Sequence, residues 1–363
     1  MRQNDTIISI NMNKLSQKEQ KIIAIILEKG ALSSSGIYSE MIRLGEDISL
    51  VTIKRTLSEM VDKGALVSMG SGRATSYDIS VAGRVSVEVD AKKYCSIEPD
   101  KRHGLTRYNF DLFAAMPADI FSERELKVLS EATIEFKKRI EDLPPAIQKK
   151  ELERLVIELS WKSSKIEGNT YTLLDTEKLI LENKAAAGHD KKETQMILNH
   201  KDAFNFVREN SAQFKTITKI NLEKLHAILV KDLDVGLGLR KKLVGVVGSA
   251  YRPLDNIYQI TEAVEALGKA VSTTSAPYAR ALIALLGISY IQPFEDGNKR
   301  VARLAANAVL LAYGLAPLSY RSVDENDYRE AMLVFYELNS ITPFKKIFIE
   351  QYDFAAQNYA IKN

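Results

Sequence analysis

The sequence is poor in the residues that most often build metal centres. Its 363 residues include one cysteine, Cys95, and four histidines. A single cysteine excludes an internal disulfide and a zinc site built from several thiolates. The histidines show no HExxH or other paired spacing, so a histidine metal site is not expected. A GxSxG motif and a Walker-type glycine-rich loop are also absent, which argues against serine hydrolases and P-loop nucleotide enzymes.

Long apolar stretches and a strong net charge are missing as well. No uninterrupted hydrophobic run approaches the roughly 20 residues of a membrane-spanning helix. Residues 1–5 lack the apolar core of a signal peptide, so we expect a cytoplasmic protein without a membrane partner. The net charge of +3 is too small to indicate nucleic-acid binding by itself. A content of 45% hydrophobic and 27% charged residues is typical of a globular chain.

Residues 1–80 have the pattern of a small winged helix-turn-helix domain. Three helices are expected, of which the first ends at Gly30 and the third runs from a Ser49 cap to Gly64. Two short strands around a glycine-containing turn at residues 70–73 then resemble the wing of such domains. This resemblance depends on the order of the elements alone, because no distinctive motif accompanies it.

The rest of the chain is expected to be mainly helical. Residues 81–120 form a predicted linker with short strands, because residues 85–89 alternate apolar and polar side chains. Helical periodicity dominates residues 121–363, which we take as the second domain. Residues 243–249 interrupt it, and their valines and glycines predict a short β-hairpin. The predicted fold class is therefore mainly α, with one hairpin in a helical core that follows a winged-helix domain.

One stretch, residues 291–303, has the features of a phosphate site. Pro293 disfavours helix at Gln292, and a buried helix is predicted to begin at the Gly297-Asn298 pair. The free N–H groups and the dipole at a helix start favour a phosphate group.

Three charged side chains extend this predicted site. Asp296 directly precedes the helix start, where a carboxylate can hold a hydrated Mg²⁺ that bridges phosphate oxygens. Arg300 and Arg303, in the first turns of the helix, can bind further phosphate oxygens. The same residues also fit an ordinary helix start with solvent-facing arginines, and the residues alone leave that alternative open.

The stretch resembles the signature of the Fic family, His-Pro-Phe-x-(Asp/Glu)-Gly-Asn-(Gly/Lys)-Arg-x-x-Arg. Every specified position from Pro293 to Arg303 agrees, and only the first differs, where Gln292 stands in place of the catalytic histidine. The resemblance extends from about residue 105 to the C-terminus, and residues 248–253 are similar to the family's flap.

The resemblance implies a Fic-type helical core that binds ATP and Mg²⁺ and transfers AMP to a Ser, Thr or Tyr hydroxyl of a target protein. It also implies roles for single residues. The catalytic positions are Gln292 (the general-base position), Asp296, Asn298 and Arg300; the nucleotide-binding positions are Gly297, Asn298, Arg300 and Arg303; and the metal ligand is Asp296.

A second segment resembles the family's inhibitory motif, (Ser/Thr)-x-x-x-Glu-(Gly/Asn). Ser163 and Glu167 are four residues apart and share one face of a helix that Gly168 is predicted to end. In the family such a glutamate pairs with the second arginine of the signature, here Arg303, and occupies the space of the γ-phosphate. The resemblance thus implies autoinhibition by a helix that precedes the core, and a solvated helix end is the alternative.

Gln292 determines which function the resemblance implies. The family's histidine takes the proton from the attacking hydroxyl, whereas a glutamine amide accepts hydrogen bonds but no proton near neutral pH. Loss of a positioned base costs about 10²–10⁴-fold in rate. We therefore expect an adenylyltransferase impaired at Gln292, whether that residue is natural to the protein or a substitution. The alternatives are a non-catalytic, nucleotide-sensing DNA-binding regulator and a protein-interaction scaffold, and the phosphate-binding residues argue against the scaffold.

DNA is the expected partner of the N-terminal domain. Thr52, Lys54 and Arg55 lie near the start of its third helix, where they can enter a major groove, and Arg73 lies on the wing. Acidic residues nearly balance the basic ones, so a protein partner is the alternative. The target protein and the DNA site stay open, as does the choice between a monomer and a homodimer.

Overall fold

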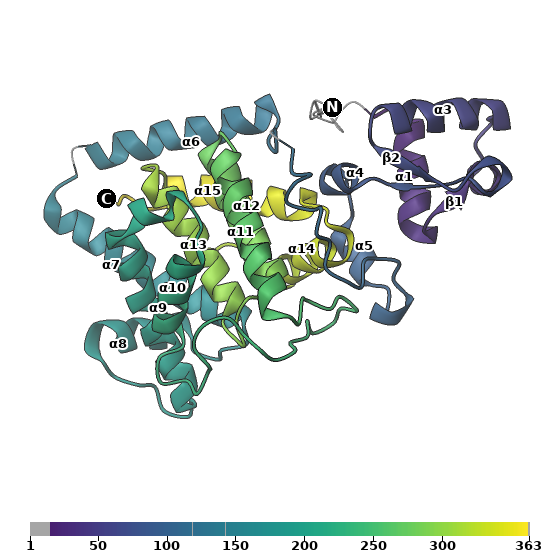
Figure 1. The fold of residues 1–363 in the computed structure, drawn as a ribbon. Coiled ribbons are helices and arrows are strands. Elements are labelled where there is room, and N and C mark those ends of the chain that lie inside the picture. Colours follow the sequence, from purple (N-terminus) through teal and green to yellow (C-terminus); the bar gives the residue numbers. More distant parts are fainter. Residues whose placement is uncertain (1–14, 118, 142, 362–363) are drawn as a thin grey trace, which may run out of the picture. The chain divides into compact units, whose positions relative to one another are not determined.

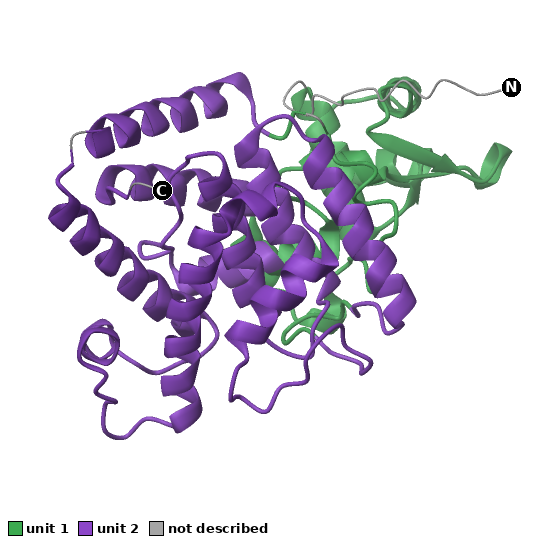
Figure 2. Ribbon diagram, turned by 60° about the vertical axis from the view of Figure 1, so that its left-hand side comes forward, with its two compact units in different colours: residues 1–120, 246–251, 333–343 green, residues 121–245, 252–332, 344–363 purple. Residues whose placement is uncertain are grey.

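The computed structural model describes residues 15–117, 119–141 and 143–361, and this part of the chain is mainly helical (Figure 1). The chain divides into two compact units, which Figure 2 shows in two colours. Unit 1 comprises Met1–Ile120, Val246–Tyr251 and Leu333–Pro343, and unit 2 comprises Phe121–Gly245, Arg252–Met332 and Phe344–Asn363. Two short segments from the C-terminal part of the sequence thus belong to the N-terminal unit.

The N-terminal unit begins with the predicted winged-helix order. Its elements are α1 (Gln17–Lys29), α2 (Ser34–Arg43), α3 (Leu50–Asp62), β2 (Leu66–Met69) and β3 (Ser76–Ile79). The last two strands pair antiparallel, with Leu66 opposite Ile79. Strand β3 also pairs with β1 (Leu32–Ser33), which the sequence pattern did not predict because two residues are too few to show an alternation.

Serine caps and apolar faces explain these three helices. Ser49 accepts the N–H of Thr52, as predicted for the start of α3, and Ser33 caps α2 in the same way. The apolar faces of the helices then meet in one core. Its fully buried members include Ile22, Ile37, Met41, Ile53 and Leu57.

The linker forms short helices where strands were predicted. Residues 81–95 contain α4 (Val81–Ser86) and α5 (Ala91–Cys95), so the prediction of a strand at residues 85–89 was wrong. The cause is a local cap, because the hydroxyl of Ser80 accepts the N–H of Gly83 and starts a helix. Val85 and Val87 are buried as their alternation suggested, but from the end of a helix rather than from a strand.

The second unit is built around two central helices, α12 (Pro277–Ile291) and α13 (Asn298–Ala312), whose residues are nearly all buried. Helices α7 (Pro145–Ile166), α9 (Lys191–Glu209) and α10 (Lys219–Leu229) pack against α13, and α11 (Ile257–Thr273) packs against α12. The remaining α-helices of the described residues are α6 (Glu123–Glu141), α8 (Leu173–Glu182), α14 (Glu325–Leu338) and α15 (Thr342–Asn358). Within the described ranges, no helix has both the length and the apolar character that a membrane crossing needs.

The hairpin predicted at residues 243–249 is an irregular loop instead. Ser249 N–H donates to the carbonyl of Val246 at 3.2 Å, which closes a turn, but no strand is assigned to these residues, all of which the structure describes. Pro253 lacks an N–H for a returning strand, and an isolated two-stranded hairpin is marginally stable. The prediction of a mainly helical fold is confirmed, and that of strands in this loop was wrong.

Gly268, on α11, is a position where one added methyl group should destabilise the protein. A Cβ there would lie 2.3 Å from the carbonyl oxygen of Ile217. We expect Gly268→Ala to lower the free energy of unfolding by about 1–3 kcal/mol, as overpacking does. Gly245→Ala is the matched control, because its Cβ would meet no atom within 4 Å. Urea denaturation measures both variants, and an unchanged midpoint for Gly268→Ala would contradict the close packing.

Candidate functional site

The turn between α12 and α13 is the centre of the candidate site. Helix α12 ends at Ile291, and Gln292 follows in a left-handed conformation with φ of 51° while its N–H donates to Ile288 O at 3.0 Å. Gly297, with φ of 80°, precedes α13, which begins at Asn298 as predicted. The first N–H groups of α13 have no partner within the helix, so this helix start favours an anion.

Asn298 fixes the shape of this turn. Its Oδ1 accepts the N–H of Phe294 at 2.8 Å, and its Nδ2 donates to the carbonyl of Phe294 at 2.8 Å. The side chain is buried, and both of its polar atoms are used in these bonds. In this structure the side chain of Asn298 therefore holds the loop, and its backbone N–H belongs to the donors of the helix start.

Arg240, which the sequence analysis did not single out, binds the C-terminal end of α12. Its backbone N–H donates to Pro293 O at 3.0 Å, and its Nε donates to Gln292 O at 2.6 Å. Its two terminal nitrogens donate to the carbonyls of Lys242 and Leu254. Arg240 thus ties the signature turn to the two ends of the loop that contains residues 243–253. An arginine among lysines and glycines gives no sequence signal that it will be buried.

His226 supports the same turn from α10. Its ring stacks on Phe294 with a centroid distance of 3.9 Å, and its Nε2 donates to Asp296 O at 3.1 Å. Burial lowers the pKa of His226 to about 4, so the ring is neutral near pH 7. No spacing in the sequence indicated the contact of His226 with the signature turn.

Arg300 is almost fully buried, but its guanidinium is only partly paired. Its Nη2 lies 3.1 Å from Oδ2 of Asp296, whose side chain is 65% exposed. Its Nη1 is buried and makes no hydrogen bond within the part of the chain that the structure describes. An unsatisfied buried donor costs about 1–3 kcal/mol, and more when it is charged. A bound anion would remove that cost.

Arg303 is fully buried on the next turn of α13. Its Nε donates to Ser163 Oγ at 2.9 Å, its Nη2 donates to Ser163 O at 2.8 Å, and its Nη1 lies 3.4 Å from the Tyr328 hydroxyl. Glu167 Oε1 lies 2.9 Å from Nη2, so the ion pair implied by the resemblance is formed. It joins α13 to the end of α7, after which Gly168 turns the chain with φ of 96°.

Glu167 is held in its ionised form by two cations. Burial by itself would raise its pKa, but the charges of Arg303 and Lys299 outweigh burial and hold the pKa below its ordinary value of 4.5. Lys299 Nζ lies 3.5 Å from Oε2. The ionised carboxylate is therefore itself the anion beside the start of α13.

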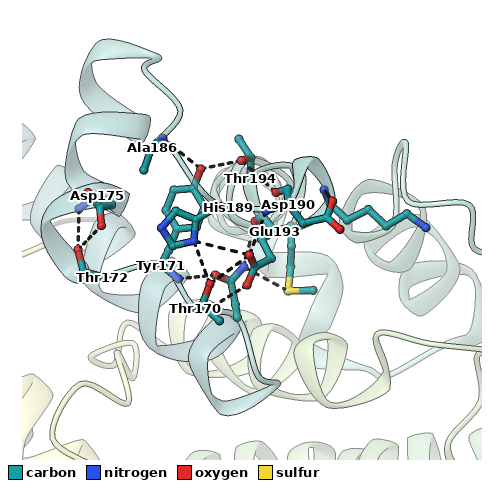
Figure 3. A network of polar contacts seen from close by, with 12 residues as sticks. Thr170, Tyr171, Thr172, Asp175, Ala186, His189, Asp190, Glu193 and Thr194 are labelled. Atoms are coloured by element: carbon teal, nitrogen blue, oxygen red, sulfur yellow. Dashed lines mark hydrogen bonds and ion pairs between the residues drawn. The ribbon is translucent and has the colours of Figure 1, made fainter.

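The segment after Glu167 is fixed against α9, as Figure 3 shows. The N–H of Thr170 donates to Glu193 Oε1 at 2.7 Å, and its hydroxyl donates to Oε2 at 3.1 Å and lies 2.9 Å from Nδ1 of His189. Asn169 Nδ2 donates to the carbonyl of Glu193 at 3.0 Å. This network holds the chain that directly follows Glu167 against α9.

The structure brings the predicted residues of the signature and of the inhibitory motif together around the start of α13. They are Ser163, Glu167, Gly168, Gln292, Asp296, Gly297, Asn298, Arg300 and Arg303. The predicted DNA contacts belong to unit 1 and form no part of this site. Lys54, Arg55 and Arg73 are exposed there, and Thr52 is half-buried beside the Ser49 cap.

The arrangement suits the binding of a multiply charged anion better than proton transfer. Backbone N–H groups and the guanidinium of Arg300 supply donors, while the exposed Asp296 supplies one carboxylate for a cation. Gln292 Nε2 donates to Ser289 O at 2.6 Å, and its neutral amide takes up no proton near pH 7. The site therefore has anion donors without a base at Gln292.

Two family models match the chain. The Fic/DOC family matches residues 216–310, which include the signature turn and most of α13, and the penicillinase repressor family matches residues 15–96. Residues 216–310 are thus a Fic/DOC domain, and the winged-helix module precedes it in the chain.

Relatives of the Fic/DOC domain carry the name protein adenylyltransferase Fic. The protein from Nematostella vectensis is 29% identical over 177 residues, which cover 47% of this chain and 41% of that protein. The protein from Drosophila yakuba is 28% identical over 182 residues, or 49% of this chain and 37% of that protein. The matched part of the chain therefore spans about two fifths of the length of these relatives.

Solved structures share the fold of the helical core. Fic-1 from C. elegans aligns with a TM-score of 0.57 at 19% identity, over 65% of this chain and 72% of that one. A Fic-domain signalling protein from Bacteroides thetaiotaomicron aligns with a TM-score of 0.53 at 21% identity, over 65% and 99% of the two chains. The solved structures show the fold of the helical core, and the family match places a Fic/DOC domain at residues 216–310 of the chain. The chain carries, in addition, an N-terminal module of the penicillinase repressor type.

The neutral His226 predicts how stability depends on pH. Its folded-state pKa of about 4 lies below the ordinary 6.5, so between these values the unfolded chain binds the proton and the folded protein does not. The free energy of unfolding should therefore fall as the pH drops from 6.5 towards 4. His226→Phe keeps the stacking but not the titration, and its stability should fall less steeply over that range. Equal slopes in urea denaturation across this pH series would contradict a buried neutral ring.

Proposed function

We propose that this protein is a Fic-type adenylyltransferase that transfers AMP from ATP to a Ser, Thr or Tyr hydroxyl of a target protein. Glu167 inhibits the reaction, and Gln292 weakens it at the general-base position. The observation that supports this proposal most directly is Arg300, which is buried and partly unpaired beside the start of α13 in a Fic/DOC domain.

The phosphate chain of ATP matches the donors of the site. The N–H groups at the start of α13 and the unpaired Nη1 of Arg300 bind phosphate oxygens. Arg303 is the partner of the γ-phosphate once Glu167 has withdrawn. Because Glu167 holds Arg303 in this structure, the carboxylate and the γ-phosphate compete for one guanidinium.

Asp296 is the residue that would hold Mg²⁺. Its side chain is 65% exposed at the helix start, and Mg²⁺ commonly uses one or two carboxylates together with water and substrate phosphates. Among the described residues, no three His, Cys, Asp or Glu side chains gather into a metal site made by protein alone. When bound, Mg²⁺ would neutralise part of the negative charge of the phosphate groups.

In the proposed reaction the target hydroxyl oxygen bonds to the α-phosphorus while the bond from that phosphorus to the bridging oxygen breaks. Pyrophosphate leaves, and the hydroxyl proton must pass to a base. Gln292 cannot take it, so the proton passes to solvent water instead, and the rate should be lower by about 10²–10⁴-fold. Arg300 and Arg303 still stabilise phosphate charge, and phosphoryl transfer relies chiefly on positioning and on such charges.

A nucleotide-sensing DNA-binding regulator without catalysis is the second candidate. Two observations favour it, the penicillinase repressor match over residues 15–96 and the amide at Gln292. Lys54 and Arg55 are exposed on α3, and Arg73 is exposed on the wing, as contact with DNA phosphates or bases requires. Both candidates bind a nucleotide, but only the first transfers AMP to a target protein.

Removal of the inhibitory carboxylate should tighten the binding of ATP. In Glu167→Gly, Arg303 becomes available to the γ-phosphate, and one charge-assisted contact of about 1.5–3 kcal/mol predicts a gain of at least about tenfold. AMP has no γ-phosphate, so its affinity should change much less. Titration calorimetry with Mg²⁺-ATP and with AMP measures both.

Two further variants control that experiment. Glu182→Gly also removes a glutamate that ends a helix and pairs with a lysine, but outside the site, and should leave ATP affinity unchanged. Arg300→Ala, introduced with Glu167→Gly, should weaken the binding of both ATP and AMP. If Glu167→Gly binds no ATP, the proposal of an intact nucleotide site is wrong.

Transfer itself should depend on position 292. The parent chain is expected to label proteins weakly or not at all, while Gln292→His with Glu167→Gly should restore labelling because it supplies the base and removes the inhibitor. Asp296→Ala in that background should abolish the labelling again. Radiolabelled ATP with a cell extract is a sufficient assay. A silent double variant that still binds ATP would favour the regulator, and strong labelling by the parent would contradict the role given to Gln292.

A further inference from the structure

The carboxylate of Glu337, near the end of α14, is buried in unit 1 and accepts three side-chain hydrogen bonds. Arg102 Nη2 donates to Oε1 at 2.8 Å, and the hydroxyl of Ser249 donates to the same oxygen at 2.6 Å. Tyr94 donates to Oε2 at 2.8 Å. The side chains of Arg102 and Glu337 are only 2% and 3% exposed.

These hydrogen bonds hold the segment Val246–Tyr251, here named the flap loop because residues 248–253 resemble the family's flap. Besides the Ser249 contact, Arg102 Nη2 donates to the carbonyl of Gly248. Within the loop, Ser249 N–H donates to Val246 O at 3.2 Å, and Tyr251 N–H donates to Ser249 Oγ at 3.1 Å. The hydroxyl of Ser249 thus connects the loop's own turn to Glu337.

The residues just after Glu337 bind the winged-helix module. Ile341 N–H donates to Val85 O at 3.0 Å, and the hydroxyls of Ser340 and Thr342 donate to Val87 O at 2.6 and 2.7 Å. Val87 itself is part of the winged-helix core. A short series of hydrogen bonds therefore runs from that core through residues 337–342 to the flap loop, all within unit 1.

Because both charges are buried, this connection is costly to break. A carboxylate and a guanidinium that are both removed from water must keep their partners, because separation leaves an unpaired buried charge. Satisfied networks of this kind rigidify the groups that they join. Gly104 permits the close packing, since a Cβ there would lie 2.9 Å from the carbonyl oxygen of Glu337.

We propose that the flap loop moves as one body with the winged-helix module, that the Arg102–Glu337 pair is the joint, and that a DNA duplex bound to the module controls the freedom of the loop. The proposal rests on the proposed function for its DNA partner. Three residues beyond the loop, Leu254 O accepts a hydrogen bond from Arg240, which also binds Gln292 O. The loop is therefore connected to the signature turn by three residues of chain and by the two hydrogen bonds of Arg240.

Hydrogen–deuterium exchange of the full chain tests the joint without DNA. In Arg102→Ala the amides of Ser249 and Tyr251 should exchange at least about tenfold faster, because a charge-assisted hydrogen bond is lost. Arg102→Lys keeps the charge and should restore part of the protection. Arg84→Ala is the matched control, since it breaks another ion pair of unit 1, with Asp78, that does not touch the loop. Unchanged exchange in Arg102→Ala would overturn the joint.

A second arm adds a short DNA duplex of mixed sequence at low salt. In the parent, the duplex should slow exchange in residues 246–251 as well as in α3, whereas in Arg102→Ala only α3 should respond, with unchanged DNA affinity. Protection of α3 without any change in the flap loop of the parent would overturn the coupling. A protein that binds no duplex would contradict both the DNA control and the proposed DNA partner, while the exchange rates without DNA would still decide the joint.

Discussion

The candidate site depends on one fully buried cation, Arg303. A guanidinium in such a place needs hydrogen-bond acceptors and a countercharge, and Ser163, Tyr328 and Glu167 supply them from two other helices. The serine and the tyrosine belong to the packed structure, whereas the carboxylate is 19% exposed and lies at a helix end. Glu167 is therefore the partner that another anion can replace, and a γ-phosphate is the anion that the proposed function places there.

In the proposed function, nucleotide binding and proton transfer depend on different groups. The shape of the signature turn is fixed by groups that do not react, namely Asn298 from within, Arg240 at the end of α12 and His226 by stacking. None of them needs a histidine at position 292, where the glutamine takes the left-handed conformation that the turn requires. The candidate anion site therefore does not depend on a base at position 292, which fits both the impaired enzyme and the nucleotide sensor of the proposed function.

Much of the fold could be predicted because its signals are local. The Ser49 cap, the helix start at Gly297-Asn298 and the helix end at Gly168 depend on neighbouring residues, and the structure has each of them. The predictions of a strand at residues 85–89 and of the hairpin were wrong, because alternation and β-branched side chains indicate burial but do not identify a partner strand. Arg240 and His226 were missed for a related reason. Their roles come from contacts with residues far along the chain, which no spacing in the sequence reveals.

The central claim is that the carboxylate of Glu167 pairs with the guanidinium of Arg303 where a phosphate would otherwise bind. Carbon-13 NMR can monitor the ionisation of the Glu167 carboxylate in a pH series. The series, recorded with and without saturating Mg²⁺-ATP, tests the claim most directly. We expect a pKa below 4.5 for Glu167 in the free protein, because two cations flank the carboxylate, and a clear rise of that pKa when ATP takes Arg303 away. A pKa of ordinary value in the free protein, or one that saturating ATP leaves unchanged, would contradict it.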